Sequence, residues 1–133
     1  MFTGIIEAMG TVTTVNETAA GRRMRMTEPG LLADMAVGDS VAVNGVCLTA
    51  VDVADGSVAV DVVQESLDRS NLGALAIGER VDLERPMPAD GRFDGHIVQG
   101  HVDQTAVCTK VDEAAGSCYY TFESPPVQAP AGH

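Results

Sequence analysis

The chain has 133 residues, of which 45% are hydrophobic and only 4% aromatic, and its formal net charge is −11 at pH 7. This length suits one domain with a substantial hydrophobic core, and the apolar content excludes a disordered chain. The negative charge argues against nucleic acid and anionic membranes as partners, because like charges repel.

The sequence also bears on cellular location. No apolar run approaches the roughly 20 residues that a membrane helix needs. The first residues, Met1-Phe2-Thr3-Gly4, lack the basic segment that is typical of a secretory signal. The chain has three cysteines, Cys47, Cys108 and Cys118, which is an odd number at wide spacing. This pattern favours reduced thiols over a disulfide framework. We therefore expect a cytoplasmic protein.

The first part of the chain shows short β-strands separated by turns. Asn44-Gly45 is a strong hairpin signal, because both central positions of a tight two-residue turn need a positive φ, and Asp55-Gly56 predicts a second such turn. The expected strands are 4–15, 22–27, 40–43, 46–53, 57–63 and 80–84, with helical segments at 31–35 and 65–71. We therefore expect an all-β fold, a six-stranded antiparallel Greek-key-like barrel with short helical turns.

The segment after the last expected strand marks a boundary, because residues 85–91 contain prolines, a glycine and charges. Gly100-His101-Val102-Asp103 then follows Gly4-Ile5-Ile6-Glu7 by 96 residues (100 − 4 = 96), which indicates the beginning of a second copy of the barrel. In a second copy, the counterpart of the Asn44-Gly45 turn would fall near position 140, beyond the 133 residues of the sequence. We therefore expect an incomplete repeat. The predicted organisation is a barrel over 1–87, a linker over 88–94, a partial repeat over 95–123 and an extended or disordered Pro/Ala/Gly tail over 124–133.

The strand after Asn44-Gly45 offers the first chemically useful residues. Side chains alternate along a strand, so Cys47 and Thr49 share one face, where a thiol and a hydroxyl can contact a polar heterocycle at the barrel mouth. The alternative is a buried cysteine and an ordinary strand threonine, which is the commoner situation. A second candidate is the segment 61–66, where a strand passes into a helix. Its backbone N–H and C=O groups can pair with a pyrimidinedione edge, or it is simply the start of a helix.

Two histidines and two cysteines raise the question of a metal. His96, His101, Cys108 and Cys118 are all zinc-ligand types, but their spacings match no standard zinc motif. We therefore expect no metal.

Several blocks, in order and in register, resemble riboflavin synthase and its lumazine-binding relatives, covering residues 1 to about 122. They are Met1-Phe2-Thr3-Gly4-Ile5-Ile6, Val43-Asn44-Gly45-Val46-Cys47-Leu48-Thr49, Glu65-Ser66-Leu67, Ser70-Asn71-Leu72-Gly73, Val81-Asp82-Leu83-Glu84-Arg85 and Gly95-His96-Ile97-Val98-Gln99-Gly100-His101-Val102. By this resemblance the chain holds the N-terminal barrel and the beginning of a second one.

The resemblance implies a function. Riboflavin synthase converts two molecules of 6,7-dimethyl-8-ribityllumazine to riboflavin and a ribitylamino-pyrimidinedione, without a metal or redox cofactor, as a homo-oligomer. The resemblance implies catalytic roles for Cys47, Ser40 and His101. Ser40 and Cys47 match positions near the ribityl chain, and His101 matches a position linked to activity. The implied ligand-binding residues are Gly4, Ile5, Ile6, Cys47, Leu48, Thr49, Asp61, Val62, Val63, Gln64, Glu65, Ser66, Gly100, His101 and Val102. Residues 4–6 are expected at the first barrel's site and residues 100–102 on the opening strand of the second.

Three functions remain open from the sequence: a riboflavin synthase, a non-catalytic lumazine or flavin carrier, and a structural barrel without a ligand. We expect a dimer or trimer, because unpaired strand edges after residue 95 tend to recruit another chain. We also expect little turnover, because an incomplete second repeat leaves the second substrate without its pocket.

Overall fold

A computed structural model describes residues 1–92 and 94–126 of the chain. The chain divides into two compact units between Val102 and Asp103. Among the described residues, no helix is both long and apolar enough to cross a membrane.

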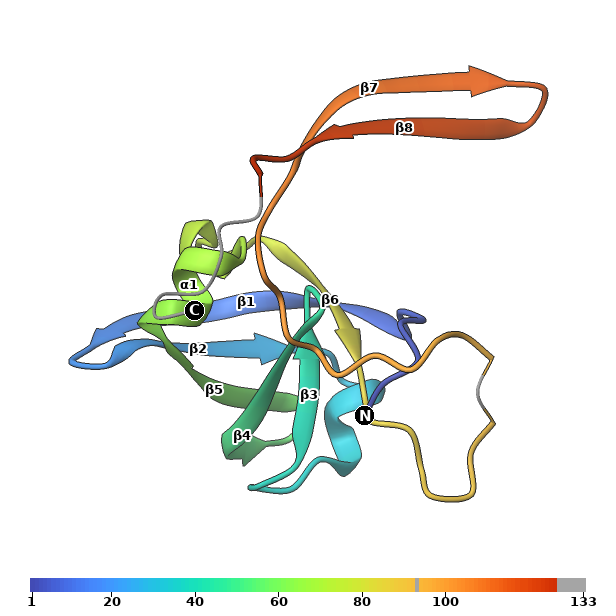
Figure 1. The fold of residues 1–133 in the computed structure, drawn as a ribbon. Coiled ribbons are helices and arrows are strands. Elements are labelled where there is room, and N and C mark those ends of the chain that lie inside the picture. Colours follow the sequence, from blue (N-terminus) through green and yellow to red (C-terminus); the bar gives the residue numbers. More distant parts are fainter. Residues whose placement is uncertain (93, 127–133) are drawn as a thin grey trace, which may run out of the picture. The chain divides into compact units, whose positions relative to one another are not determined.

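The first unit contains a closed antiparallel barrel with the strand order β1-β2-β5-β4-β3-β6 (Figure 1). Strand β6 closes the barrel, because it pairs with both β1 and β3. The expected all-β barrel of six strands is therefore confirmed. The elements are β1 (Ala8–Thr18), β2 (Gly21–Thr27), the 3-10 turn η1 (Leu31–Asp34), β3 (Ser40–Val43), β4 (Val46–Ala54), β5 (Ser57–Val63), helix α1 (Gln64–Arg69), the 3-10 turn η2 (Leu72–Ala74) and β6 (Arg80–Glu84).

Local backbone conformation explains where the expected and observed elements differ. β1 begins at Ala8 rather than at residue 4, and Gly4, with a φ of +87°, turns the chain before the ladder starts. At Asn44-Gly45 both residues have positive φ, +49° and +82°, as the predicted hairpin requires. The predicted two-residue hairpin turn at Asp55-Gly56 is present between the paired residues Ala54 and Ser57. Only Gly56 has a positive φ, so this turn is of a different type from that at Asn44-Gly45.

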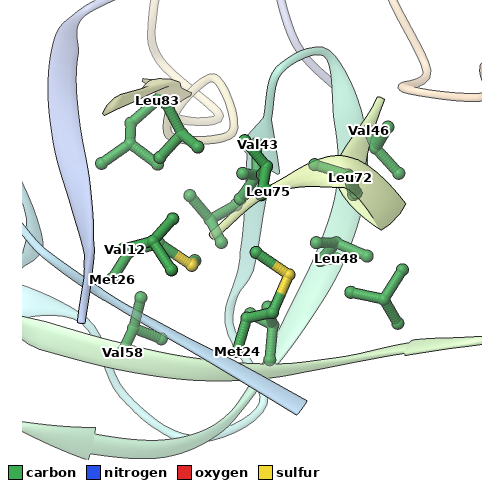
Figure 2. Packing of buried hydrophobic residues seen from close by; sticks show 14 of the residues in the cluster. Val12, Met24, Met26, Val43, Val46, Leu48, Val58, Leu72, Leu75 and Leu83 are labelled. Carbon is green, nitrogen blue, oxygen red and sulfur yellow. The ribbon is translucent and has the colours of Figure 1, made fainter. Parts of the chain in front are cut away.

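The barrel interior is filled by aliphatic and methionine side chains from all six strands and from the helical segment after β5. Figure 2 shows side chains from β1, β2, β3, β5 and β6 gathered with Leu72 and Leu75, which cover the core from the helical segment. Protein interiors of this kind are close-packed. A ligand is therefore expected on the outer wall or at a strand edge rather than inside the barrel.

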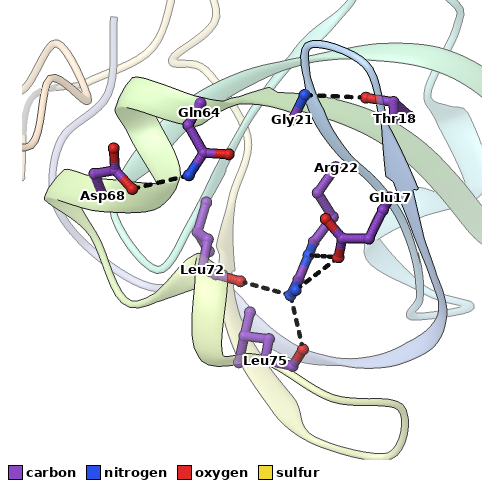
Figure 3. A network of polar contacts seen from close by, with 8 residues as sticks. All are labelled: Glu17, Thr18, Gly21, Arg22, Gln64, Asp68, Leu72 and Leu75. Carbon is purple, nitrogen blue, oxygen red and sulfur yellow. Dashed lines mark hydrogen bonds and ion pairs between the residues drawn. The ribbon is translucent and has the colours of Figure 1, made fainter.

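Arg22 fastens the helical segment to the barrel (Figure 3). Its guanidinium donates to the carbonyl oxygens of Leu75 at 3.1 Å and Leu72 at 3.5 Å, and it pairs with Glu17 at 2.9 Å. Beside it, a Cβ added to Gly21 would lie 2.0 Å from the carbonyl oxygen of Val62. The hairpin β1–β2 is thus pressed against the end of β5 and fixes the path of the chain into α1.

The chain before β1 is fastened to the end of β6. The Glu84 carboxylate, 4% exposed, accepts hydrogen bonds from the N–H groups of Thr3 (2.7 Å) and Gly4 (3.1 Å) and from the Thr3 hydroxyl (3.0 Å). Next to it, the Glu7 carboxylate accepts a hydrogen bond from the Arg85 N–H at 2.7 Å and pairs with its guanidinium at 3.0 Å. The side-chain hydrogen bond from Arg85 holds the pKa of Glu7 below its usual value.

In the second unit, β7 (Val107–Ala114) and β8 (Ser117–Glu123) form an antiparallel hairpin. The strand pairing of this hairpin repeats that of β1–β2 at a spacing of 96 residues. The first pair of β1–β2, Thr11 with Thr27, corresponds to the pair Val107 with Glu123. The bulge recurs as well, at Thr13 and at Thr109, and each of these hydroxyls donates to a carbonyl of the partner strand at 3.3 Å. The hairpin therefore begins a second barrel repeat, as the sequence predicts.

Candidate functional site

The ladder between β4 and β5 ends before either strand does. Registered pairs between these strands run from Ala54–Ser57 to Ala50–Val60 and stop there. The register shift next to Val51 marks a bulge, and a bulge bends its strand and increases the local twist. Beyond it, residues 46–49 pair with β3 and residues 61–63 pair with β2. We call the space between residues 46–49 and 61–63 the β4–β5 seam.

Cys47 and Thr49 lie on the outer face of the seam. Cys47 is half-buried and Thr49 exposed, whereas Leu48 between them belongs to the core. Opposite residues in an antiparallel pair point to the same side, and Ser40 lies opposite Thr49 on β3. One thiol and two hydroxyls therefore share this face, and the two hydroxyls can donate or accept hydrogen bonds.

The other side of the seam is the end of β5 and the beginning of α1. Val62 is buried in the core, whereas Asp61, Val63, Gln64 and Glu65 are exposed and Ser66 is half-buried. Val62 and Leu48 can therefore contact a ligand at the seam mainly through their backbones.

The charge of Asp61 on this side of the seam is already compensated. The guanidinium of Arg23 hydrogen-bonds both of its oxygens, at 2.7 and 2.9 Å, which lowers the pKa of Asp61. The opposed charge makes the carboxylate the stable form, so Asp61 is poorly suited to donate a proton at neutral pH.

Residues 100–102 lie against the β4 side of the seam. The backbone N–H of Cys47 donates to the carbonyl oxygen of Gly100 at 2.9 Å, and Val102 packs on the barrel core. His101, between them, is exposed. A Cβ on Gly100 would lie 2.6 Å from the Cβ of Cys47, so only glycine allows this approach. The structure thus brings Gly100, His101 and Val102 to Cys47, although they are distant in the sequence.

The described contacts of residues 4–6 differ from those of residues 100–102. The described contacts of Gly4 are with Glu84 and Val98, and Ile5 and Ile6 are exposed. A hollow of about 410 Å³ is lined in part by Ile5 and Glu84, and another of about 270 Å³ is lined in part by Ser40. Neither is lined by Cys47, Thr49 or residues 61–66. The residues of the candidate site thus lie outside these two hollows, along a strand edge and the adjoining outer wall.

The four residues considered as zinc ligands are not assembled into a centre. Within residues 1–92 and 94–126, no group of three or more His, Cys, Asp or Glu side chains is placed to hold a metal ion. All three cysteines are free, Cys47 half-buried and Cys108 and Cys118 exposed.

Two residues that fasten distant segments to the barrel, Glu84 and Arg22, are not predicted from the sequence. No local signal pointed to Glu84, because alternation with the inward-facing Val81 and Leu83 predicts an outward, exposed side chain at this position. No local signal pointed to Arg22, because the carbonyls that it binds lie 50 and 53 residues away.

The fold and the site together define a class of protein. It is an all-β protein built on a closed six-stranded antiparallel barrel, in which the ladder between two neighbouring strands is interrupted at the β4–β5 seam. The sequence comparison is more specific, because the model of the lumazine binding domain matches residues 3–86. The chain belongs to the lumazine binding domain family.

Individual relatives agree with this assignment. The chain is 40% identical over 126 residues to the riboflavin synthase of Bacillus amyloliquefaciens, covering 95% of this chain and 59% of that protein. It is 53% identical over 106 residues to that of Mycobacterium tuberculosis, covering 79% of this chain and 53% of the relative. The chain thus spans between half and two thirds of the length of these relatives.

Solved structures share the fold. The crystal structure of LumP complexed with 6,7-dimethyl-8-(1′-D-ribityl)lumazine matches with a TM-score of 0.84 at 21% identity, over 94% of this chain and 69% of that chain. The structure of LumP complexed with riboflavin matches with a TM-score of 0.82 at 24% identity, over 94% of this chain and 68% of that chain.

Proposed function

We propose that the chain binds 6,7-dimethyl-8-ribityllumazine and riboflavin at the β4–β5 seam. The observation that carries this proposal is the interrupted ladder between residues 46–49 and 61–63. Strand edges present N–H and C=O groups in alternation, which suits the pyrimidinedione edge of both ligands. The ring would lie between Cys47–Thr49 on one side and residues 61–66 on the other, with residues 100–102 against β4.

The ribityl chain of these ligands is a polyol and needs hydroxyl partners. Ser40 and Thr49 lie opposite each other on the outer face beside the seam, and Ser40 also lines a hollow of about 270 Å³. We propose that these hydroxyls bind the ribityl chain and that Cys47 lies near its attachment to the ring.

We propose that the reaction served by this site is that of riboflavin synthase, the dismutation of two lumazines to riboflavin and a ribitylamino-pyrimidinedione. One lumazine loses a proton from its C7 methyl group and attacks a second one, so the main task is to hold two rings face to face. Backbone N–H groups and hydroxyls at the seam would stabilise the anion. Cys47, Ser40 and His101 are the side chains proposed to act near the reacting groups.

A second candidate function is a non-catalytic lumazine or flavin carrier. The observation that favours it is the likeness in fold to LumP, whose solved structures are complexes with 6,7-dimethyl-8-(1′-D-ribityl)lumazine and with riboflavin. A carrier would bind ligand with the same residues and release it unchanged.

One experiment on the 133-residue chain separates these possibilities. Titration of riboflavin, followed by quenching of its fluorescence, should saturate at one ligand per chain. Incubation with 6,7-dimethyl-8-ribityllumazine, followed by chromatography of the products, then tests turnover. Binding with riboflavin formation supports the synthase, and binding without it supports the carrier. Absence of binding would leave a structural barrel and contradict the proposal.

Three further expectations stay proposals. We propose the division into a barrel over 1–87, a linker over 88–94 and a repeat over 95–123; of the tail over 124–133, residues 127–133 lie outside the described residues. We propose a homo-oligomer, because strand edges recruit other strands. We propose a cytoplasmic location, in keeping with three free cysteines.

A further inference from the structure

Four polar side chains lie in a row across the outer wall of the barrel, two on each side of the β4–β5 seam. On one side, Ser40 of β3 lies opposite Thr49 of β4. On the other side, Asp61 of β5 lies opposite Arg23 of β2. Opposite residues of an antiparallel pair share a face, so each pair presents its polar groups together. We call these four residues the polar row.

The two halves of the polar row meet at the seam. The last registered pair of β4 and β5 is Ala50 with Val60, and both residues belong to the core. Counting on by one residue from this pair sets Thr49 against Asp61. Side chains alternate along a strand, so Thr49 and Asp61 point outward where their neighbours point inward, and both are exposed. A ligand at the seam therefore lies beside both.

Arg23 holds the carboxylate of Asp61 with a two-pronged grip. Its Nε donates to Oδ1 at 2.7 Å and its Nη2 donates to Oδ2 at 2.9 Å. A carboxylate offers about four acceptor positions, so each oxygen can still accept another hydrogen bond. Both side chains are about half-exposed, and exposed ion pairs add little to the stability of a fold. The consequence of the pair is therefore a carboxylate of fixed orientation at the seam.

We propose that Arg23 is a positioning residue for the ligand: it fixes the Asp61 carboxylate in the polar row, where that carboxylate accepts a hydrogen bond from a ribityl hydroxyl. This inference rests on the proposed function and adds to it a residue outside the seam. A hydrogen bond from a hydroxyl to a carboxylate is charge-assisted and stronger than one between neutral groups. The ribityl chain thus meets the hydroxyls of Ser40 and Thr49 and one fixed anion.

The advantage of Arg23 is that it orders Asp61 before the ligand arrives. An exposed carboxylate without such a partner takes several orientations, and a ligand that needs one of them must order the side chain on binding. The planar fork of a guanidinium matches both carboxylate oxygens at once and removes this cost. Loss of the fork should raise the Kd of a ribityl ligand about three- to ten-fold, the effect of ordering one side chain.

Arg25 provides a matched control. It lies two residues further along β2 on the same face, and it also binds an aspartate, Asp52, and the hydroxyl of Ser57 at 2.8 Å. Asp52 is registered with Ala59, within the part of the β4–β5 ladder that is intact. Arg25 thus resembles Arg23 in type, strand and partner but lies away from the seam. Arg25→Met should leave riboflavin binding unchanged.

Two flavins separate a contact with the ribityl chain from a general change of the barrel wall. Lumiflavin has the same ring as riboflavin, with a methyl group in place of the ribityl chain. In fluorescence titrations of the 133-residue chain, Arg23→Met should raise the Kd of riboflavin about three- to ten-fold and leave that of lumiflavin unchanged. Equal weakening of both flavins by Arg23→Met overturns the proposal. Equal effects of Arg23→Met and Arg25→Met on riboflavin overturn it as well.

A double-mutant cycle tests whether Arg23 acts through Asp61. Asp61→Ala should weaken riboflavin binding at least as much as Arg23→Met, and the two changes together should weaken it no further than Asp61→Ala alone. An undiminished loss in the Asp61→Ala background overturns the proposal. If the parent chain binds riboflavin and Arg23→Met leaves the Kd unchanged, the proposed function stands and the role of Arg23 fails. If the parent chain binds no riboflavin, the proposed function fails and the role of Arg23 fails with it.

Discussion

Phe2 and Val98 exchange two backbone hydrogen bonds, from Phe2 N–H to Val98 C=O at 2.7 Å and from Val98 N–H to Phe2 C=O at 2.9 Å. Val98 follows Phe2 by 96 residues, which is also the spacing between β1–β2 and β7–β8. Phe2 is thus paired with the residue that holds the same place in the second repeat. Residues 100–102 then contact the barrel at Cys47, whereas their counterparts 4–6 are exposed on this unit.

Replacing Thr49 by valine tests the seam. The change keeps the shape of the side chain and removes its hydroxyl, so riboflavin affinity should fall by about one hydrogen bond, on the order of 1 kcal/mol or roughly five-fold in Kd. Thr14→Val, at an exposed position of β1, is the control and should leave the Kd unchanged. Equal affinity of the Thr49 variant and the parent chain would remove Thr49 from the site.

Replacing Gly100 by alanine tests the contact of residues 100–102 with β4. Gly100 has a φ of +83°, and a Cβ there would lie 2.6 Å from the Cβ of Cys47. The segment should be displaced, and riboflavin affinity should fall by about ten-fold or more, because part of the site is lost. Gly116→Ala is a matched control, since its φ is +82° and no atom lies within 4 Å of an added Cβ. If the two variants bind riboflavin equally well, residues 100–102 do not take part.

Replacing Glu84 by glutamine tests the attachment of the N-terminal segment. The amide nitrogen cannot accept the hydrogen bonds that the carboxylate receives from Thr3 and Gly4. The free energy of unfolding in urea should fall by about 1–3 kcal/mol, the cost of a buried donor left unpaired. The amides of Thr3 and Gly4 should also exchange with deuterium faster. Glu79→Gln, at an exposed position before β6, should have little effect on either measurement.

Lowering the pH should weaken the Glu7–Arg85 pair. The hydrogen bond from Arg85 lowers the folded-state pKa of Glu7 from its ordinary value of 4.5, so its contribution to stability is fully present well above that value. This contribution is lost as the pH falls through the lower, folded-state value. The pair is partly solvated, so its size is at most about 1 kcal/mol. The difference in unfolding free energy between the parent chain and Glu7→Gln should therefore shrink from neutral pH to about pH 3. A difference independent of pH would contradict this account.

Replacing Arg22 by methionine tests the attachment of the helical segment. The carbonyls of Leu72 and Leu75 lose their donor, and unfolding free energy should fall by about 1–3 kcal/mol in urea. Arg23→Met removes an exposed ion pair with Asp61 instead, and should lower the unfolding free energy much less, because exposed ion pairs contribute little. Equal losses in the two variants would show that the carbonyl contacts contribute little.

The sequence by itself determined the local structure and the family. Asn44-Gly45 specifies its turn because few other residue pairs accept positive φ at both positions. Alternation of apolar and polar residues set most strand bounds, and Gly4 and Gly100 already indicated the repeat. Cys47 and Thr49 were assigned to one face of a strand from the period of two alone. These features depend on residues that are neighbours in the chain, so a single sequence contains them.

Only the tertiary structure decided which distant segments meet. The seam depends on a bulge at Val51 and on the order in which the barrel closes. The approach of Gly100 to Cys47 joins residues that are far apart in the sequence, as does the binding of Thr3 by Glu84. Nothing in the neighbourhood of Glu84 shows that its carboxylate is buried and satisfied by two N–H groups from the beginning of the chain. Such contacts arise only when the whole barrel has closed, because it is the closed barrel that brings these groups within hydrogen-bonding distance.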